Sequence, residues 1–258
     1  MPDLTSGDSY EGTRAAWRAI WERAEIEREL GTRQYPRARH IRNLFIQHLP
    51  ANQPILEAGC GLGAELIGLA DGGFSAIGVD YVTEAVGRLK RHRPALALAA
   101  GDVHALPFRG GVFGAYLSFG VLEHFASGPR AALREAFRVL RPRGTLVVTV
   151  PAPNLVWRLA RLRRRALGRG ELAQGYYETA FSATDLAAHV ASEGFEIVER
   201  HSVGHDFTFW GLGRAFRGAG YYETNRLALG LGTMSAHLFP RSMSFATLLI
   251  ARKRTAAA

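Results

Sequence analysis

The pattern of apolar and polar positions divides the chain at about residue 50. Residues 12–49, which include WRAIWERAEIEREL and PRARHIRNLFIQHL, place apolar side chains at helical spacing without strand alternation. From residue 53 onward, short apolar runs alternate with amphipathic stretches. We therefore predict an N-terminal helical extension over residues 1–50, which we expect to act as a lid, followed by one larger unit over residues 51–258.

The second region reads as strands separated by helices. Strands are predicted at QPILEA, FSAIGVD, ALALAAGD, VFGAYLSF, GTLVVTVP, FEIVERH and SMSFATLLIARK. Helices are predicted at AELIGLADG, TEAVGRLKRH, PRAALREAFRVLRP and residues 182–192, with Pro142 and Gly144 marking the end of the third. This alternation favours an α/β fold with a mostly parallel sheet, right-handed crossovers and helices on both faces.

A glycine-rich loop joins the first of these strands to the first helix. In ILEAGCGLGAELIGLA, residues 55–70, Gly59, Gly61 and Gly63 alternate with other residues. Because glycine has no Cβ, such a loop lets the backbone approach a ligand closely. The stretch also satisfies the loose dinucleotide pattern G-x-G-x-x-G/A, with Asp80 about 20 residues further on. A dehydrogenase is therefore one alternative.

Acidic residues near the predicted strand ends favour another cofactor. Glu57 precedes the glycines by two residues, where its charge would oppose a pyrophosphate but suit a ligand with an ammonium group. Asp80 and Asp102 close the second and third strands, so we expect them side by side at the carboxyl edge of the sheet, where ligands bind. Their alternative role is to cap helices or to solvate loops.

These motifs, in this order, resemble the class I S-adenosylmethionine-dependent methyltransferases, in the group that includes ubiquinone/menaquinone-type and many small-molecule enzymes. The resemblance rests on LEAGCGLG, GVD, GDVHALPF, VLEHF and LRPRGTLVV, and covers residues 53–150 most strongly. It implies a Rossmann-like, doubly wound sheet of seven strands, the last antiparallel. It also implies helical insertions at about 154–180 and 204–240.

The resemblance assigns S-adenosyl-L-methionine as cofactor and gives the candidate residues their roles. Glu57 would help hold the methionine ammonium, and the three glycines would let the backbone pack against the methionine and ribose. Asp80 would accept both ribose hydroxyls. Asp102 would accept from the adenine amino group, beside the Val103 amide. The set of cofactor-binding candidates is completed by Tyr81, Ser118 and Phe119, the last two bordering the methyl-transfer site.

His124 in VLEHF is the candidate catalytic residue. A hydroxyl acceptor must lose a proton, and the ordinary pKa of histidine, about 6.5, suits proton transfer at neutral pH. The alternative is that Glu123 and His124 cap the segment that leads to Pro129 or have a packing role. Glu123 as an acid partner of His124 is the weaker hypothesis.

The net charge of +9 indicates either an anionic partner or an arginine-rich composition, since Lys90 and Lys253 are the only lysines. Amino-methyltransferases of nucleic acids usually carry an N/D-P-P-Y/F tetrapeptide after the fourth strand. Here that place holds SFGV, residues 118–121. We therefore predict a small-molecule acceptor and no nucleic-acid partner.

The stretch NLVWRLARLRRRALGRG, residues 154–170, combines a Leu stripe with six arginines and no acid. This pattern is typical of an interfacial membrane helix, so peripheral membrane contact through residues 154–169 is one hypothesis. The alternative is that the stripe packs on the core. The aromatic residues that follow suggest either the wall of an acceptor pocket or a secondary core: Tyr176, Tyr177, Phe181, Phe207, Phe209, Trp210, Phe216, Tyr221 and Tyr222.

We therefore predict a methyltransferase acting on a small, apolar or aromatic acceptor, most directly by O-methylation. The alternatives are C- or N-methylation of a lipid or natural product, and a non-catalytic cofactor-binding protein. Because Cys60 is the only cysteine, we predict neither an internal disulfide nor a metal site. The sequence shows no signal segment, so we expect a cytoplasmic protein. Any membrane contact is then expected at the inner face of the membrane. The sequence gives no indication of the oligomeric state.

Overall fold

A computed structural model gives the fold, and it describes residues 6–166 and 178–255. The described strands form one seven-stranded sheet in the order β3-β2-β1-β4-β5-β7-β6. All neighbouring pairs are parallel except those made by β7, which is antiparallel to both β5 and β6. The predicted sheet is confirmed. Its strands are β1 (Ile55–Ala58), β2 (Ala76–Asp80), β3 (Ala97–Ala100), β4 (Phe113–Phe119), β5 (Leu140–Pro151), β6 (Phe195–Val203) and β7 (Ala246–Lys253).

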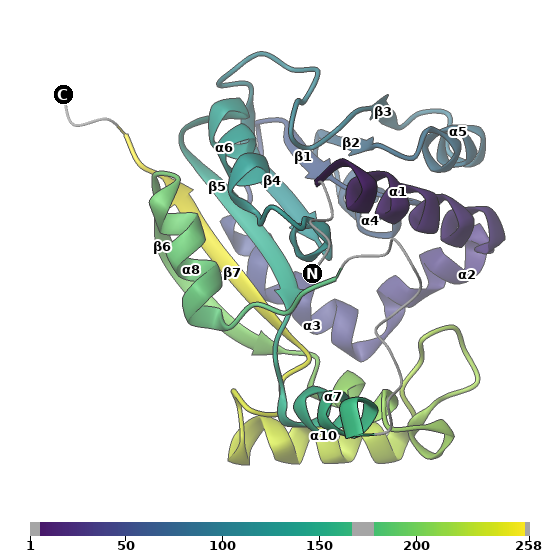
Figure 1. The fold of residues 1–258 in the computed structure, drawn as a ribbon. Coiled ribbons are helices and arrows are strands. Elements are labelled where there is room, and N and C mark those ends of the chain that lie inside the picture. The colour runs from purple at the N-terminus through teal and green to yellow at the C-terminus, as the bar shows by residue number, and fades with distance from the viewer. Residues whose placement is uncertain (1–5, 167–177, 256–258) are drawn as a thin grey trace.

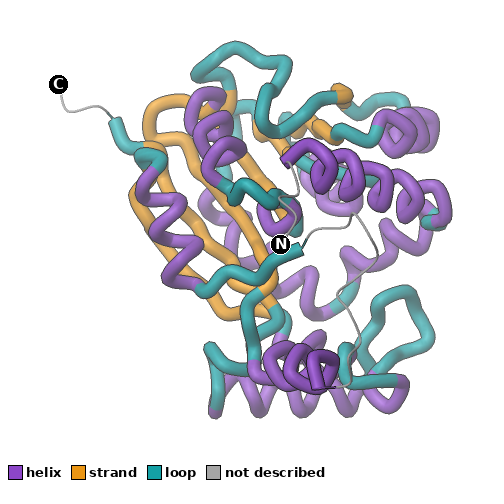
Figure 2. The backbone as a smooth tube through the Cα atoms, viewed as in Figure 1, coloured by secondary structure: helices purple, strands orange, loops and turns teal. Residues whose placement is uncertain are grey.

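Helices cover both faces of the sheet (Figure 2). The crossover helices are α4 (Ala64–Asp71), α5 (Thr83–His92), α6 (Arg130–Val139) and α8 (Ala183–Ser192). Side chains alternate along β4, so that Tyr116 joins the apolar core beneath α6 and α8, whereas Leu117 joins the core beneath α4. Burial on both faces explains why β4 is apolar almost throughout.

The N-terminal region is helical, as predicted. It comprises α1 (Ser6–Arg23), α2 (Ile26–Gly31), the 3-10 turn η1 (Thr32–Gln34), α3 (Pro36–Phe45) and the turn η2 (Ile46–His48). Phe45 of α3 is fully buried in the core with α4. In Figure 1, α1 crosses the sheet beside β1 and β4, and α3 lies below it. The extension is thus anchored to the sheet.

The remaining elements follow β4 and β5 or precede β7. They are η3 (Leu122–His124), α7 (Leu155–Ala166), α9 (His205–Trp210), η4 (Arg214–Phe216) and α10 (Arg226–Leu238). The second predicted insertion, residues 204–240, is therefore largely helical. In the described part of the chain, no helix is both long and apolar enough to cross a membrane.

One boundary differs from the sequence prediction. We predicted a helix reaching Pro142, but α6 ends at Val139 and β5 begins at Leu140. Proline disfavours helical backbone at the residue before it, so the helix stops ahead of the Arg-Pro pair.

Candidate active site

The loop after β1 turns through three glycines in left-handed conformation, Gly59 (φ 81°), Gly61 (φ 51°) and Gly63 (φ 76°). Space is short as well: a Cβ on Gly61 would lie 2.6 Å from the Trp21 ring. Non-glycine residues adopt this backbone at a cost of about 1–2 kcal/mol. The loop therefore presents bare backbone to the pocket, as predicted.

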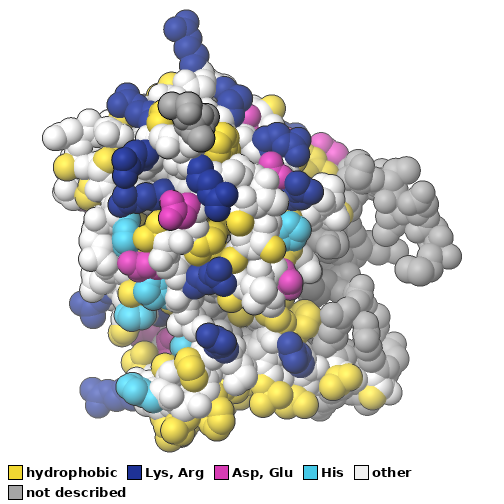
Figure 3. Space-filling view, turned by 90° about the vertical axis from the view of Figure 1, so that its left-hand side faces the viewer, with side chains coloured by type: hydrophobic (Ala, Val, Ile, Leu, Met, Phe, Trp, Pro, Cys, Tyr) yellow, Lys and Arg dark blue, Asp and Glu magenta, His cyan; other side chains and the backbone are white. Residues whose placement is uncertain are grey.

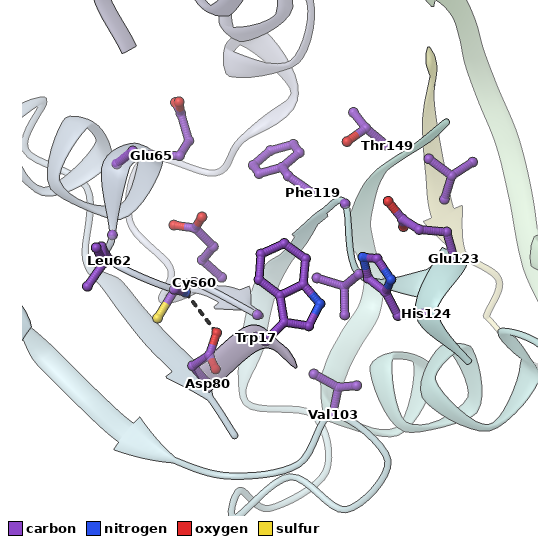
Figure 4. A pocket seen from close by; sticks show the side chains of 18 of the residues that line it. Trp17, Cys60, Leu62, Glu65, Asp80, Val103, Phe119, Glu123, His124 and Thr149 are labelled. Carbon is purple, nitrogen blue, oxygen red and sulfur yellow. Dashed lines mark hydrogen bonds between the residues drawn. The ribbon is translucent and has the colours of Figure 1, made fainter. Parts of the chain in front are cut away.

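Asp80 ties the end of β2 to this loop. Its Oδ2 accepts the Gly61 amide at 2.8 Å, a bond marked in Figure 4, and its Oδ1 accepts the Val82 amide at 2.8 Å. Burial raises the pKa of this carboxyl, while these amides act in the opposite direction. The carboxylate lines the pocket beside the glycines and retains acceptor capacity for the hydroxyls of a ligand.

Glu57 lies buried behind the glycine loop. Its Oε2 has no hydrogen-bond partner, although it faces a pocket. Burial, together with the charges of Glu65 and Asp80, raises its pKa well above the usual range. The backbone of Leu66 forms a hydrogen bond with the Glu57 carboxyl, but a buried oxygen without a partner, as Oε2 is, remains costly, and a cationic ligand beside it would remove that cost. These residues fit the ammonium group and the ribose of S-adenosylmethionine.

Both carboxylate oxygens of Asp102 already accept hydrogen bonds from other residues of the protein. Its Oδ2 accepts the Tyr10 hydroxyl at 2.7 Å, and its Oδ1 accepts both the amide and Nδ1 of His104 at 2.8 Å. Although burial acts to raise it, these hydrogen bonds hold the pKa of Asp102 at about 2. An adenine amino group would therefore share this carboxylate with Tyr10 of the N-terminal helix.

Helix α1 closes this side of the pocket. Tyr10, Trp17 and Trp21 all line it, and α1 is fastened to α5 by the Arg18–Glu84 ion pair at 3.0 Å. Arg88 of α5 donates to the carbonyl of Ala24 at 2.7 Å and also to that of Trp21. The sequence analysis proposed a lid in general terms. It did not identify these aromatic residues, although the Trp pair in WRAIW is the signal that points to them.

The pocket, of about 680 Å³, continues from the cofactor residues to an apolar end. That end is lined by Ile41, Phe45, Phe119, Tyr222 and Phe245, which come from α3, β4, the segment before α10 and the residue before β7. In Figure 4, Phe119 and Trp17 face His124 and Glu123 across the cavity. The apolar end is thus assembled from segments far apart in the sequence.

Among the predicted site residues, only Ser118 stays outside the pocket lining. Its side chain is fully buried in β4, and the Oγ has no hydrogen-bond partner. Successive side chains of a strand point to opposite faces, so Phe119 reaches the pocket and Ser118 does not. The structure brings the other ten together: Glu57, Gly59, Gly61, Gly63, Asp80, Tyr81, Asp102, Val103, Phe119 and His124.

Glu123 and His124 form the 3-10 turn after β4, and both are buried in the pocket wall. The His124 ring lies edge-on to Trp17, with centroids 5.2 Å apart. Glu123 Oε2 has no hydrogen-bond partner, and burial, with a smaller contribution from the charge of Glu178, raises the pKa of this carboxyl to about 8. Glu123 is therefore a pocket group in its own right, whereas the sequence analysis considered it only as a partner of His124 or as part of a cap.

The predicted aromatic wall is mostly a secondary core. Phe207 stacks on Trp210, with centroids 4.9 Å apart, and meets Phe245 edge-on at 4.8 Å. Tyr222 alone of the described candidates lines the pocket, and its backbone is left-handed (φ 52°). Tyr176 and Tyr177 lie outside the described residues.

Comparison with known proteins agrees with this geometry. A model of the methyltransferase domain matches residues 56–148. The demethylmenaquinone methyltransferase of Beutenbergia cavernae is 42% identical over 95 residues, which cover 36% of this chain and 39% of that protein. A probable S-adenosylmethionine-dependent methyltransferase of Mycolicibacterium smegmatis is 29% identical over 162 residues, covering 62% and 58%. The alignments thus span less than two thirds of either relative.

A solved structure extends the likeness in fold to nearly the whole chain. The 1,6-didemethyltoxoflavin-N1-methyltransferase of Burkholderia thailandensis, with bound 1,6-didemethyltoxoflavin and S-adenosylhomocysteine, has a TM-score of 0.64 at 16% identity. The structural alignment covers 99% of this chain and 93% of the chain of that enzyme. The domain match shows a methyltransferase domain over residues 56–148, and the solved structures show that nearly the whole chain has the fold of the class I S-adenosylmethionine-dependent methyltransferases.

Proposed function

We propose that this protein transfers a methyl group from S-adenosylmethionine to a small, apolar or aromatic acceptor, most directly at oxygen. The observation that carries the proposal is the two-ended pocket. Glu57, Asp80 and the glycine loop line one end, and apolar side chains such as Phe119 and Phe245 line the other. One cavity therefore has room for a charged cofactor beside an uncharged acceptor.

The cofactor, when bound, supplies a methyl group that its sulfonium already activates. The task of the chain is to align the acceptor and to exclude water, which is chiefly a matter of proximity and orientation. Trp17 and Trp21 on α1 cover the pocket, and Phe119 gives a flat acceptor a surface to lie against, backed by the buried Phe45 ring 5.3 Å away.

As in the sequence analysis, His124 is the residue that we propose removes the proton from the acceptor. Glu123 takes a second role, because a carboxyl with a pKa of about 8 is mostly protonated at neutral pH. Its free Oε2 then donates a hydrogen bond to an oxygen of the acceptor. A neutral base next to a neutral acid suits an acceptor that bears two oxygens.

Some of the relatives support a small acceptor without fixing its atom. One is named for demethylmenaquinone and one solved neighbour for N1 of 1,6-didemethyltoxoflavin, whereas others are named probable tRNA methyltransferases. Transfer to carbon or nitrogen of a lipid or natural product is therefore the alternative within this class. The alternative outside it is a cofactor-binding protein without turnover.

Peripheral contact with a membrane through residues 154–169 belongs to the same proposal. The sequence left open whether the leucines of this stretch pack on the core. In the structure, Leu155, Leu159 and Leu162 of α7 are all exposed, which supports the interfacial hypothesis. The inner face of the membrane is the surface we propose for this contact.

The direct test is incubation of the purified protein with methyl-labelled cofactor and a panel of phenols, quinols, amines and lipids, followed by metabolite extracts. We expect label in an apolar hydroxylated compound. Label in a carbon or nitrogen product would select the alternative within the class. Cofactor binding without any labelled product would contradict the enzymatic proposal.

A further inference from the structure

The large apolar side chains exposed on the described surface gather in one place. Eight of the twelve lie on α7, on α10 or on the residue that follows α10. They are Leu155, Trp157, Leu159, Leu162, Leu227, Met234, Leu238 and Phe239, and we call this set the α7–α10 surface. Scattered exposed leucines are ordinary, but a concentration of this kind marks an interaction site.

The outward leucines of α10 are not required by its packing. The helix buries its small residues Ala228, Gly232 and Ser235 at positions i, i+4 and i+7. The packing there is close, because a Cβ on Gly232 would lie 2.6 Å from the backbone nitrogen of Asp206 in α9. Leu227 and Leu238 lie on the other side, and Leu238 is 62% exposed. This helix is thus apolar on a face that the described residues leave uncovered.

The two helices belong to one end of the molecule. The amide of Leu155 donates to the Ser242 carbonyl at 2.8 Å, which joins the start of α7 to the segment after α10. Asn154 caps α7 through the Trp157 amide at 2.8 Å and is itself buried. Figure 1 shows α7 and α10 together at the lower end, and Figure 3 shows apolar side chains with Lys and Arg along that edge. They therefore present a common surface.

The charge of these segments is entirely positive. Residues 154–170 contain six arginines, and residues 225–245 contain Arg226 and Arg241, whereas neither segment contains an Asp or a Glu. A second copy of the chain would bring like charges together. Exposed apolar side chains on segments whose sequence carries only positive charge match the interfacial zone of an anionic bilayer, which accepts both.

The acceptor end of the pocket adjoins the same segments. Pro151, which lines the pocket, is followed after three residues by Leu155, and the pocket residue Phe245 comes three residues after Ser242. An apolar acceptor dissolved in the bilayer would thus have a short route to the catalytic residues.

We infer that the α7–α10 surface docks on an anionic lipid bilayer and that α10 is as much a part of this contact as the basic helix. That the bilayer supplies the acceptor rests on the proposed function; the docking itself does not. The substrate class that follows is a lipid-soluble hydroxylated compound.

The test is flotation of the full chain with vesicles of phosphatidylglycerol and, separately, of phosphatidylcholine. We expect binding to the anionic vesicles only. Leu238→Asp on α10 and Leu159→Asp on α7 should each weaken binding about tenfold or more, since each withdraws one leucine from the apolar phase. The matched control is Val198→Asp, which changes an exposed apolar residue on the edge strand β6 and should bind like the parent.

Three outcomes would overturn the inference. One is equal binding by Leu238→Asp and the parent chain, which would remove α10 from the contact. Another is no vesicle binding by the parent. The third is a concentration-dependent dimer, seen by light scattering, that Leu238→Asp abolishes. Methyl transfer to a water-soluble phenol, measured without vesicles, separates failure of docking from failure of the proposed function.

Discussion

The two ends of the pocket are built in different ways. The cofactor end consists of the loop after β1 and the ends of β2 and β3, so its residues are set by the sheet itself. The acceptor end is assembled from α3, the end of β4, the turn η3, and single residues such as Tyr222 and Phe245. The first is constrained by backbone conformation and hydrogen bonds, the second by side-chain packing. Cofactor identity is therefore fixed by the fold, whereas acceptor identity depends on the additions to it.

This difference predicts that substitutions at the two ends separate cleanly in their effects. The largest effect is expected at the acceptor end. His124→Ala should lower turnover by about 10²–10⁴-fold, the usual contribution of general acid–base catalysis, with cofactor affinity unchanged. Steady-state kinetics and cofactor titration of the same preparation check both parts. If the turnover of His124→Ala equals that of the parent protein, His124 is not the catalytic base.

At the cofactor end, Asp80→Ala should weaken cofactor binding by about 10²-fold or more, because hydrogen bonds to a charged group contribute about 1.5–3 kcal/mol each. The loop also loses its acceptor for the Gly61 amide. Isothermal titration measures the affinity, and Glu196→Ala, which removes an exposed carboxylate in β6, is the control. Cofactor affinity equal to that of the parent would contradict the assignment of Asp80.

The acceptor end should also show a pH signature. Burial raises the pKa of Glu123 to about 8, so the protonated form that donates a hydrogen bond is present below that pH and lost above it. We expect kcat to fall as the pH rises through about 8 and this fall to disappear in Glu123→Gln, whose amide still donates. A profile that is the same in both proteins would exclude this role for Glu123.

Gly61→Ala and Gly73→Ala distinguish close approach from backbone strain. Both positions are left-handed, but a Cβ on Gly61 meets Trp21, whereas one on Gly73 has nothing within 4 Å. Gly73→Ala should lose about 1 kcal/mol of unfolding free energy, measured by denaturant titration, and Gly61→Ala should lose more, because its Cβ also clashes with Trp21. Gly61→Ala alone should also weaken cofactor binding, by about tenfold. Equal affinities for the two variants would show that the loop does not need its bare backbone.

The smallest effect is expected where the two ends meet, at the lid. Tyr10→Phe removes one hydrogen bond to Asp102 and should raise the cofactor dissociation rate about fivefold, equivalent to roughly 1 kcal/mol. Stopped-flow fluorescence of Trp17 and Trp21 would follow the release. A dissociation rate equal to that of the parent would mean that Tyr10 does not hold the lid closed.

The sequence predicted the sheet and the cofactor end because both depend on local signals. Alternating apolar runs predict the strands, and Gly59, Gly61 and Asp80 have fixed positions relative to those strands. Ser118 lies outside the pocket lining because a one-residue step along a strand reverses the direction of a side chain. The match of the methyltransferase domain to residues 56–148 covers this same part of the chain.

The acceptor end was not predictable, because its residues meet only in three dimensions. Nothing local to Phe45 or Phe245 distinguishes a pocket residue from a core residue. The aromatic stretch near residues 207–222 was open to both interpretations, and tertiary packing put Phe207 and Trp210 into a secondary core while leaving Tyr222 at the pocket. The raised pKa of Glu123 likewise arises from burial, which the sequence does not display.

The most direct test of the central claim is a calorimetric titration of the parent chain with S-adenosylmethionine, repeated with NAD under the same conditions. The account predicts one cofactor molecule per chain and no heat with NAD, because the carboxyls of Glu57 and Asp80 beside the glycine loop suit an ammonium group and ribose hydroxyls and not a pyrophosphate. Binding of NAD without binding of S-adenosylmethionine would contradict it.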